Sequence, residues 1–197
     1  MIAGILTSAV IVAFLTGTVN IGLAWRKSRT DERDRVRTVF AEAFAAYAEY
    51  REYPYAIRRR NAESPGEERV RISEKVRETQ QRLNYYLVWT RFESLSVGEA
   101  YGDLVSAARR TAGSAMREAW TARPISEDSE MNIPAATVDL ADLAEYEAAF
   151  SVAAHAHLRK FNPWPVRLAE VLRRRRGLAA GAEADRGPAD SECLGPR

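Results

Sequence analysis

The chain has 197 residues, and its 29 basic and 27 acidic residues leave a formal net charge of only +2. Without an apolar N-terminal stretch and a polar C-terminal tail, roughly 150 residues remain, which suffices for one domain with a hydrophobic core. The single cysteine, Cys193, excludes an intrachain disulfide and fits a reducing compartment. The charges are unevenly distributed, so their positions say more about partners than their sum does.

The N-terminal residues 2–25 carry no charged side chain. As a helix this stretch would rise about 36 Å, which exceeds the hydrocarbon thickness of about 30 Å and permits a tilted span. Trp25 ends the stretch as an interfacial aromatic residue. Basic side chains follow it directly, at Arg26, Lys27 and Arg29. Because basic residues stay on the cytoplasmic side, we expect residues 1–26 to form a single-pass anchor in the cell membrane, with the N-terminus outside and the following domain in the cytoplasm.

A cleaved secretory signal is the main alternative for this stretch. Such signals usually start with a basic region, whereas no basic side chain precedes the apolar run here, and the basic cluster after it favours an uncleaved anchor. Gly22-Leu23-Ala24 nevertheless offers small residues at which cleavage would be feasible. Ala9, Ala13 and Gly17 recur every four residues, which would permit close pairing of two copies, although small residues are frequent in such helices.

The rest of the chain predicts helices throughout. Apolar residues recur at spacings of three and four, and no run alternates for long enough to indicate a strand. Ser64-Pro65-Gly66-Glu67 and Ser96-Val97-Gly98-Glu99 are capping-box sequences that predict helix starts, and Pro54 should kink or interrupt the first helix. We expect helices at about 30–60, 65–92, 96–120 and 137–161, with a loop over 123–136 before the last of them.

Four amphipathic helices, with a tight connection between the second and the third, favour an antiparallel four-helix bundle. We therefore predict an all-α chain in which the transmembrane helix leads into a cytoplasmic helical domain over 27–176. A tail over 177–197, rich in Gly, Ala, Asp and Pro, should be disordered. In such a bundle the fourth helix returns towards the membrane. The loop over 123–136, which is acidic, then lies at the end of the bundle far from the membrane.

Basic and aromatic side chains follow the predicted fourth helix. A basic patch near anionic headgroups gains about 1 kcal/mol per Lys or Arg, so we predict a second, peripheral membrane contact within 161–176. Its expected contact residues are Trp164, Arg173, Arg174, Arg175 and Arg176. A solvated terminal helix with an arginine run is the alternative. Nucleic acid is not the expected partner, because consecutive arginines point around a helix and no base-reading module is present.

The sequence contains none of the usual catalytic or cofactor motifs, such as a Gly-rich phosphate loop, HExxH, GxSxG or paired CxxC. His155 and His157 are two residues apart on a predicted helix, so they point to different sides and cannot share a metal ion. We expect His157 in the core and His155 exposed. No catalytic residue, cofactor or metal site is predicted.

Tyrosines and arginines gather where the first helix is expected to be interrupted. Packing is the ordinary role of such aromatic residues, but backbone groups freed by Pro54 would allow a groove for a small molecule or a peptide. The expected rim of this groove consists of Tyr53, Tyr55, Arg58 and Arg59.

The layout is similar to that of uncharacterised single-span membrane proteins of high-GC Gram-positive bacteria. The segments that carry this resemblance, besides the N-terminal span, are AEYREYPYAIRRR (Ala48–Arg60), GEAYGDLVSAARR (Gly98–Arg110) and MREAW (Met116–Trp120). The resemblance covers most of residues 1–125. It implies no activity, cofactor or catalytic residue.

These observations favour a non-enzymatic, membrane-anchored interaction or scaffold module with basic membrane-proximal surfaces. Its expected partners are the anionic headgroups of the lipid bilayer, an unknown protein and a second copy of the chain as a homo-oligomer. An enzyme acting on a lipid or a membrane-bound substrate is one alternative, and it would need convergent carboxylates, His157 or arginines near the membrane. A small membrane-acting effector that oligomerises through the span is another.

Overall fold

The computed structural model describes residues 2–125, 127–134 and 137–162, and their side chains except those of residues 2–15 and Asp128. Contacts divide the chain into two compact units, Met1–Leu158 and Arg159–Arg197. In the second unit, the 3-10 helix η3 (Arg159–Phe161) is described, and the backbone N–H of Asn162 donates to the carbonyl of Arg159 at 3.1 Å. The predicted disordered tail lies outside the described residues.

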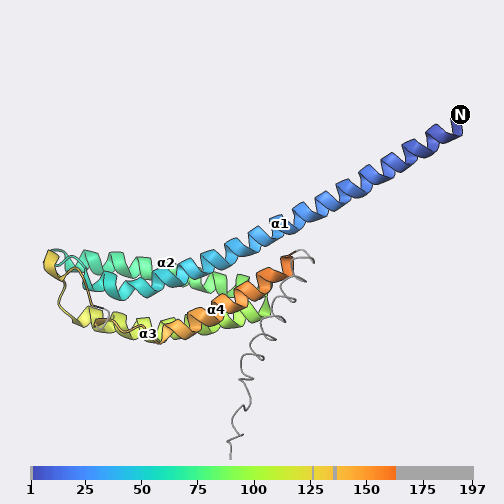
Figure 1. Ribbon diagram of the computed structural model, residues 1–197. Helices are drawn as coiled ribbons and strands as arrows, with labels where there is room; N and C mark the ends of the chain where they lie inside the picture. Colours follow the sequence, from blue (N-terminus) through green and yellow to red (C-terminus); the bar gives the residue numbers. More distant parts are fainter. Residues whose placement is uncertain (1, 126, 135–136, 163–197) are drawn as a thin grey trace, which may run out of the picture. The chain divides into compact units, whose positions relative to one another are not determined.

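In its described residues the first unit contains four α-helices and the 3-10 helix η1, and no strand is found among them (Figure 1). This confirms the predicted all-α class and the packing of four helices. The α-helices are α1 (Ile2–Arg58), α2 (Pro65–Glu93), α3 (Leu95–Thr121) and α4 (Leu143–Leu158), and the 3-10 helix η1 (Asp128–Glu130) lies in the loop before α4.

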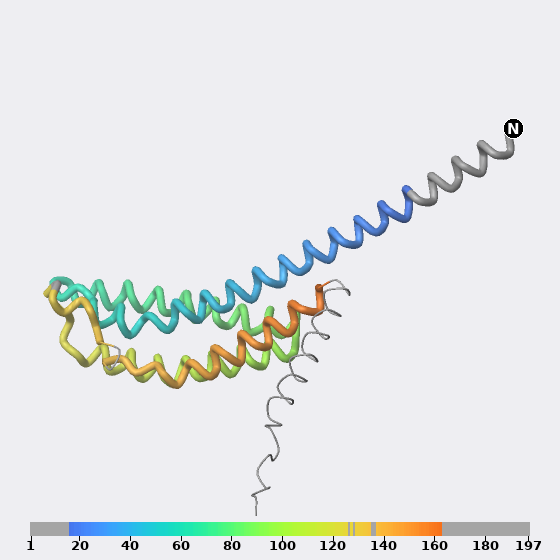
Figure 2. The backbone as a smooth tube through the Cα atoms, in the orientation of Figure 1, coloured from blue at the N-terminus to red at the C-terminus, as the bar shows by residue number. Residues whose placement is uncertain are grey.

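Helix α3 is central to the packing, because it contacts α1, α2 and α4. Helix α1 packs against α2 and α3, whereas α4 lies mainly on α3 and contacts α1 only lightly (Figure 2). The core is built from apolar side chains at helical spacing, and its largest fully buried members include Tyr47, Ile57, Leu83, Tyr101 and Leu104.

Helix α1 runs without interruption from Ile2 to Arg58, and Pro54 lies buried inside it. The predicted interruption at Pro54 is therefore wrong. The proline removes one helical hydrogen bond, the one that would reach the carbonyl of Tyr50, and the helix continues for four more residues with Tyr53 and Ile57 buried against the bundle. The described side chains from Thr18 to Arg35 are all exposed, and burial begins at Val36.

None of the helices, as far as the chain is described, contains a stretch that is both long and apolar enough to cross a membrane. The predicted anchor covers residues 2–25, and the side chains of residues 2–15 are outside the described part.

The connection between α2 and α3 is a single residue, Ser94. The predicted start of α2 at Pro65 is confirmed, but Ser64 forms no side-chain cap, and its carbonyl instead accepts from the N–H of Glu68 at 3.1 Å. The predicted second capping box is wrong, because α3 begins at Leu95, before that box. The tight turn is possible because Gly98 passes against Arg91, where a Cβ atom would lie 2.6 Å from the Arg91 Cα.

Helix α4 begins at Leu143, later than the predicted start near Thr137. The intervening chain makes a turn in which the Asp139 side chain accepts from the N–H of Ala141 at 3.0 Å. Val138 in this segment is buried. The local hydrogen bond of an aspartate competes with helix formation, which explains why the apolar spacing of the segment does not continue as a helix.

Candidate functional site

The candidate functional site is a groove between α1 and α4 with a volume of about 550 Å³. This volume lies within the range of about 300–1,000 Å³ that is usual for ligand pockets. Most of the lining is apolar and comes from Phe40, Ala41 and Phe44 on α1 and from Ala144, Ala148, Phe150, Ala154 and Leu158 on α4. Polar groups line the rest, from Arg37, Glu147, Ser151 and His155. We call this surface the α1–α4 groove.

Aromatic rings and alanines together give the groove its form. The rings of Phe44 and Phe150 stack at 6.1 Å between centroids, and Phe150 also meets Tyr101 of α3 at 5.5 Å. Phe150 therefore fixes α4 to the core at this point. Beside it, alanine side chains such as Ala148 and Ala144 are too short to fill the space between the two helices, and the groove stays open.

The acidic group in the groove is held by α1. The carboxylate of Glu147 accepts from the hydroxyl of Tyr47 and from the guanidinium of Arg51, each at 2.6 Å. Burial raises the pKa of the Tyr47 hydroxyl, and the neighbouring Glu147 raises it further, so Tyr47 remains a proton donor. Glu147 thus ties α4 to α1 and is not available as a general base in this arrangement.

The basic groups of the groove lie nearer to the C-terminal end of α4. Arg37 is exposed, and no carboxylate within the described part of the chain pairs with it. His155 is exposed, as predicted, and its Nδ1 lies 2.9 Å from the carbonyl oxygen of Ser151. His157, which is predicted in the core, is only half-buried and is not part of the groove lining; its ring lies edge-on to that of Phe40, with 5.8 Å between the centroids. No three His, Cys, Asp or Glu residues among those described are placed to hold a metal ion. The apolar lining and the exposed Arg37 therefore suit an apolar ligand that carries an acidic group on one side.

Helix α4 is unusual because it is apolar on nearly every side. A helix that is hydrophobic all round is normally buried all round. Here only Leu143, Phe150 and Ala154 are buried. The outward side chains are largely small or apolar, at Ala144, Ala148, Ala149, Ser151, Val152, His155 and Ala156, with Glu145 as the one charged residue among the exposed positions of α4.

A second polar network joins α1 to α2 around Glu49. One carboxylate oxygen accepts from Thr79 at 2.9 Å and from Tyr53 at 3.2 Å, and the other accepts from Arg82 at 2.5 Å. Burial acts to raise the pKa of Glu49. The hydrogen bonds from Thr79 and Tyr53 and the positive charge of Arg82 outweigh it and hold this pKa below its ordinary value of 4.5.

Replacing Glu49 with glutamine should make the protein less sensitive to acid. Because the pKa is depressed in the folded state, the contribution of this carboxylate is present above pH 4.5 and is lost as the pH falls through the lower folded value. The free energy of unfolding of the wild type, measured by urea denaturation between about pH 7 and pH 3, should therefore fall more steeply than that of Glu49→Gln. Glu74→Gln, on the exposed side of α2, should keep the wild-type slope; equal slopes in both variants contradict the assignment.

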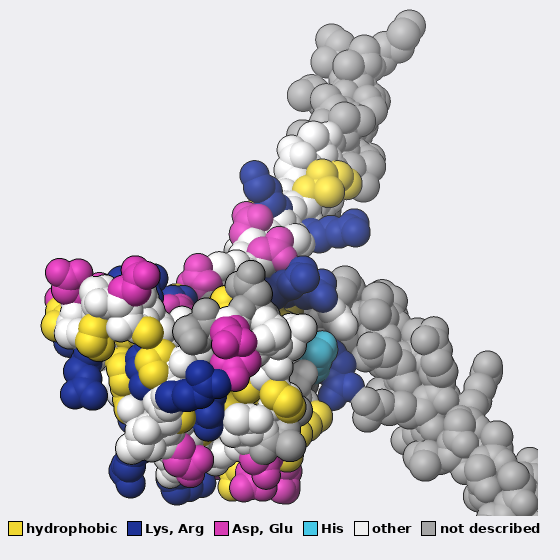
Figure 3. Space-filling view, turned by 90° about the vertical axis from the view of Figure 1, so that its left-hand side faces the viewer, with side chains coloured by type: hydrophobic (Ala, Val, Ile, Leu, Met, Phe, Trp, Pro, Cys, Tyr) yellow, Lys and Arg dark blue, Asp and Glu magenta, His cyan; other side chains and the backbone are white. Residues whose placement is uncertain are grey.

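The residues predicted to line a groove near Pro54 are placed against other parts of the bundle. Tyr53 is buried, and its hydroxyl lies 2.8 Å from that of Thr79. Tyr55 donates to the carbonyl of Val138 at 3.5 Å. The loop after α3 also contacts Arg58, whose carbonyl accepts from the N–H of Ile125, and Arg59, which donates to the carbonyl of Met131. The loop therefore lies where the sequence predicts an open rim. At this end of the bundle, apolar side chains and charges of both signs are interspersed (Figure 3).

Of the residues predicted to contact a membrane surface, the structure describes only those in α1. Trp25 is 71% exposed, and the basic residues Arg26, Lys27 and Arg29 are exposed as well. The other predicted contact residues, Trp164 and Arg173 to Arg176, lie outside the described residues.

Sequence reasoning missed the α1–α4 groove. The signal for it lies in α4, where the run from Ala148 to Leu158 contains no acidic or basic residue other than two histidines and is rich in alanine.

Comparison of the chain with models of known families, with curated proteins and with solved structures finds no match.

Proposed function

We propose that this chain is a non-enzymatic interaction module, anchored in a membrane, whose α1–α4 groove receives an apolar helix of a partner protein. The observation that carries the proposal is the apolar outer face of α4, which no described residue covers. Burial of apolar surface is the dominant favourable contribution to most protein–protein associations. A helix laid into a groove with anchors at helical spacing is a common way to cover it.

The location part of the proposal rests on the sequence. Residues 2–25 are uncharged, and basic residues follow them at once. By the positive-inside rule this arrangement supports an N-terminus outside and a bundle in the cytoplasm. In α1 the exposed stretch after Trp25 then connects the membrane to the groove without a break in the helix.

The preferred partner helix carries an acidic residue beside its apolar face. Arg37 offers a charge that no described carboxylate neutralises, whereas Glu147 already has Tyr47 and Arg51 as partners. An acidic side chain on the partner would therefore meet a free guanidinium at one end of the groove and no free carboxylate along it. Arg37 is exposed, so this contact should contribute to specificity and association rate more than to affinity.

Site-specific photo-crosslinking in cells tests both parts. A benzophenone amino acid at Ala148, in the groove, should give an adduct after irradiation, while the same group at Glu74, on the exposed side of α2, should not. Ser151→Arg, which fills the groove, should abolish the adduct at position 148, and Ser73→Arg should leave it unchanged. The irradiated chain should float with the membrane fraction.

The outcomes separate the parts of the proposal. Equal adducts at positions 148 and 74, or an adduct insensitive to Ser151→Arg, would show that the groove is not the binding surface. A chain found away from the membrane fraction would refute the anchor. An adduct of twice the chain mass would identify the partner as a second copy.

A further inference from the structure

A patch of exposed apolar side chains lies on the hairpin formed by α2 and α3. Tyr85, Val88, Trp89 and Phe92 follow one face of α2 at spacings of three and four residues, and Leu95 begins α3. Their rings form a chain, with Tyr85 and Trp89 at 5.9 Å and Trp89 and Phe92 at 6.2 Å. Exposure is highest at the turn itself, where Phe92 is 77% and Leu95 62% exposed. We call Trp89, Phe92 and Leu95 the apolar tip.

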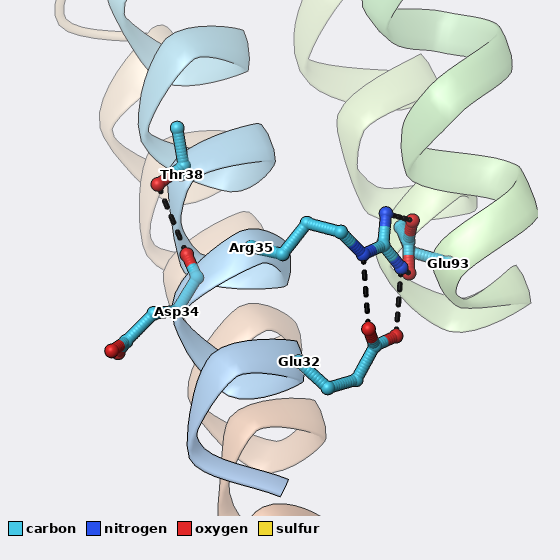
Figure 4. Close-up of polar contacts among 5 residues, drawn as sticks. All are labelled: Glu32, Asp34, Arg35, Thr38 and Glu93. Atoms are coloured by element: carbon cyan, nitrogen blue, oxygen red, sulfur yellow. Dashed lines mark hydrogen bonds and ion pairs between the residues drawn. The ribbon is translucent and has the colours of Figure 1, made fainter. Parts of the chain in front are cut away.

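An ion-pair network determines which part of α1 lies next to the apolar tip. The guanidinium of Arg35 donates to both carboxylate oxygens of Glu93, at 2.7 and 3.0 Å, and to both of Glu32, at 2.8 and 3.1 Å (Figure 4). Glu93 is the last residue of α2 and directly follows Phe92. The tip therefore lies beside the part of α1 that ends the exposed basic stretch.

From this arrangement we infer that the apolar tip is a second membrane contact, which inserts among the headgroups of an anionic bilayer. The inference rests on the proposed anchor. Arg35 is ten residues after Trp25, which corresponds to a rise of about 15 Å along a helix, and a neighbouring helix lies about 8–10 Å to the side. The usual tilt of a membrane helix from the bilayer normal reaches about 40°. If α1 tilts by this angle towards the hairpin, the tip lies only roughly 6 Å further from the bilayer centre than Trp25.

The side chains and charges of this end fit a bilayer surface better than a protein surface. Tryptophan and tyrosine are the residues that gather at membrane interfaces, and a phenylalanine and a leucine beside basic groups are typical of interfacial segments. Beside the tip, Arg91 is exposed, whereas Glu93 is paired with Arg35. Residues 26–37 of α1 add six basic and three acidic residues, which leaves a surplus of positive charge on the part of α1 between Trp25 and the level of the tip.

Depth measurements with a spin label test the contact. The full chain with Cys193→Ser receives one new cysteine, either Leu95→Cys in the tip or Val70→Cys, which is 59% exposed near the other end of α2. Each is labelled with a nitroxide and reconstituted in phosphatidylcholine vesicles that contain phosphatidylserine. The label at position 95 should be several-fold less accessible than that at 70 to a water-soluble nickel chelate and more accessible to oxygen. Omission of phosphatidylserine should reduce this difference.

The possible failures are distinguishable. If the chain floats with the vesicles and both labels are equally accessible to nickel, the anchor stands and the contact of the apolar tip is refuted. If the chain does not float, the anchor and the contact both fail. Dipolar broadening between labels at position 95 would show that a second copy covers the tip instead of lipid, which also overturns the inference. Circular dichroism of both labelled chains, unchanged from the wild type, confirms that the substitutions preserve the bundle.

Discussion

Replacing Gly98 with alanine should lower the free energy of unfolding by about 2–3 kcal/mol, because overpacking a tight contact costs typically 1–3 kcal/mol and this one involves backbone. The added Cβ would lie 2.6 Å from the Cα of Arg91 and 2.9 Å from its backbone N. Neither atom can move away as a flexible side chain would. The two helices would have to separate at their single-residue connection, Ser94.

A glycine elsewhere in the same helix provides the control. At Gly113 a Cβ would meet nothing within 4 Å, so Gly113→Ala should be neutral or stabilise the protein by up to about 1 kcal/mol through helix propensity. Both variants are compared with the wild type by urea denaturation in a mild detergent, followed by circular dichroism. Equal stability changes of the same sign at the two positions would contradict a steric role for Gly98.

The sequence allowed the helices to be predicted where their ends are set by local chemistry. Pro65 marks the start of α2 because a proline suits the first helical turn, where its missing donor has no helical partner. The start of α3 was missed by one residue, since the close approach of Gly98 to Arg91 sets the turn there. A contact between two helices cannot be predicted from the capping residues of either helix.

Tertiary contacts determine where the residues predicted to line a groove are placed. Tyr53 is buried against α2, where its hydroxyl lies 2.8 Å from that of Thr79, a polar residue on a mainly polar helix. Helical spacing does place Thr79 on the buried face of α2, between Ile72 and Leu83, but its polar side chain sets it apart from the apolar residues of that face. The α1–α4 groove likewise depends on α4 packing mainly against α3, and helical spacing predicts an apolar face without saying how much of it is covered. The anchor stays a prediction from the sequence.

Removing the side chain of Arg60 should lower the free energy of unfolding by about 3 kcal/mol, because hydrogen bonds to a charged group contribute about 1.5–3 kcal/mol and several are lost together. Arg60 is only 9% exposed and donates to the carbonyls of Ile57 and Ala119, both at 2.9 Å, and of Ala122, at 2.6 Å. These carbonyls are at the C-terminal ends of α1 and α3, where a positive charge is favourable.

The neighbouring Arg59 makes a matched control for Arg60→Ala. Arg59 is exposed, and among the described residues its guanidinium donates only to the carbonyl of Met131, at 3.2 and 3.3 Å, so Arg59→Ala should change stability by no more than about 0.5 kcal/mol. Arg60→Lys adds a further test, because lysine keeps the charge but cannot span three carbonyls with a planar fork. It should recover only part of the loss in urea denaturation. Full recovery of stability in Arg60→Lys would show that the effect of Arg60 is due to its charge alone. Equal losses of stability in Arg60→Ala and Arg59→Ala would contradict a role of Arg60 in capping α3.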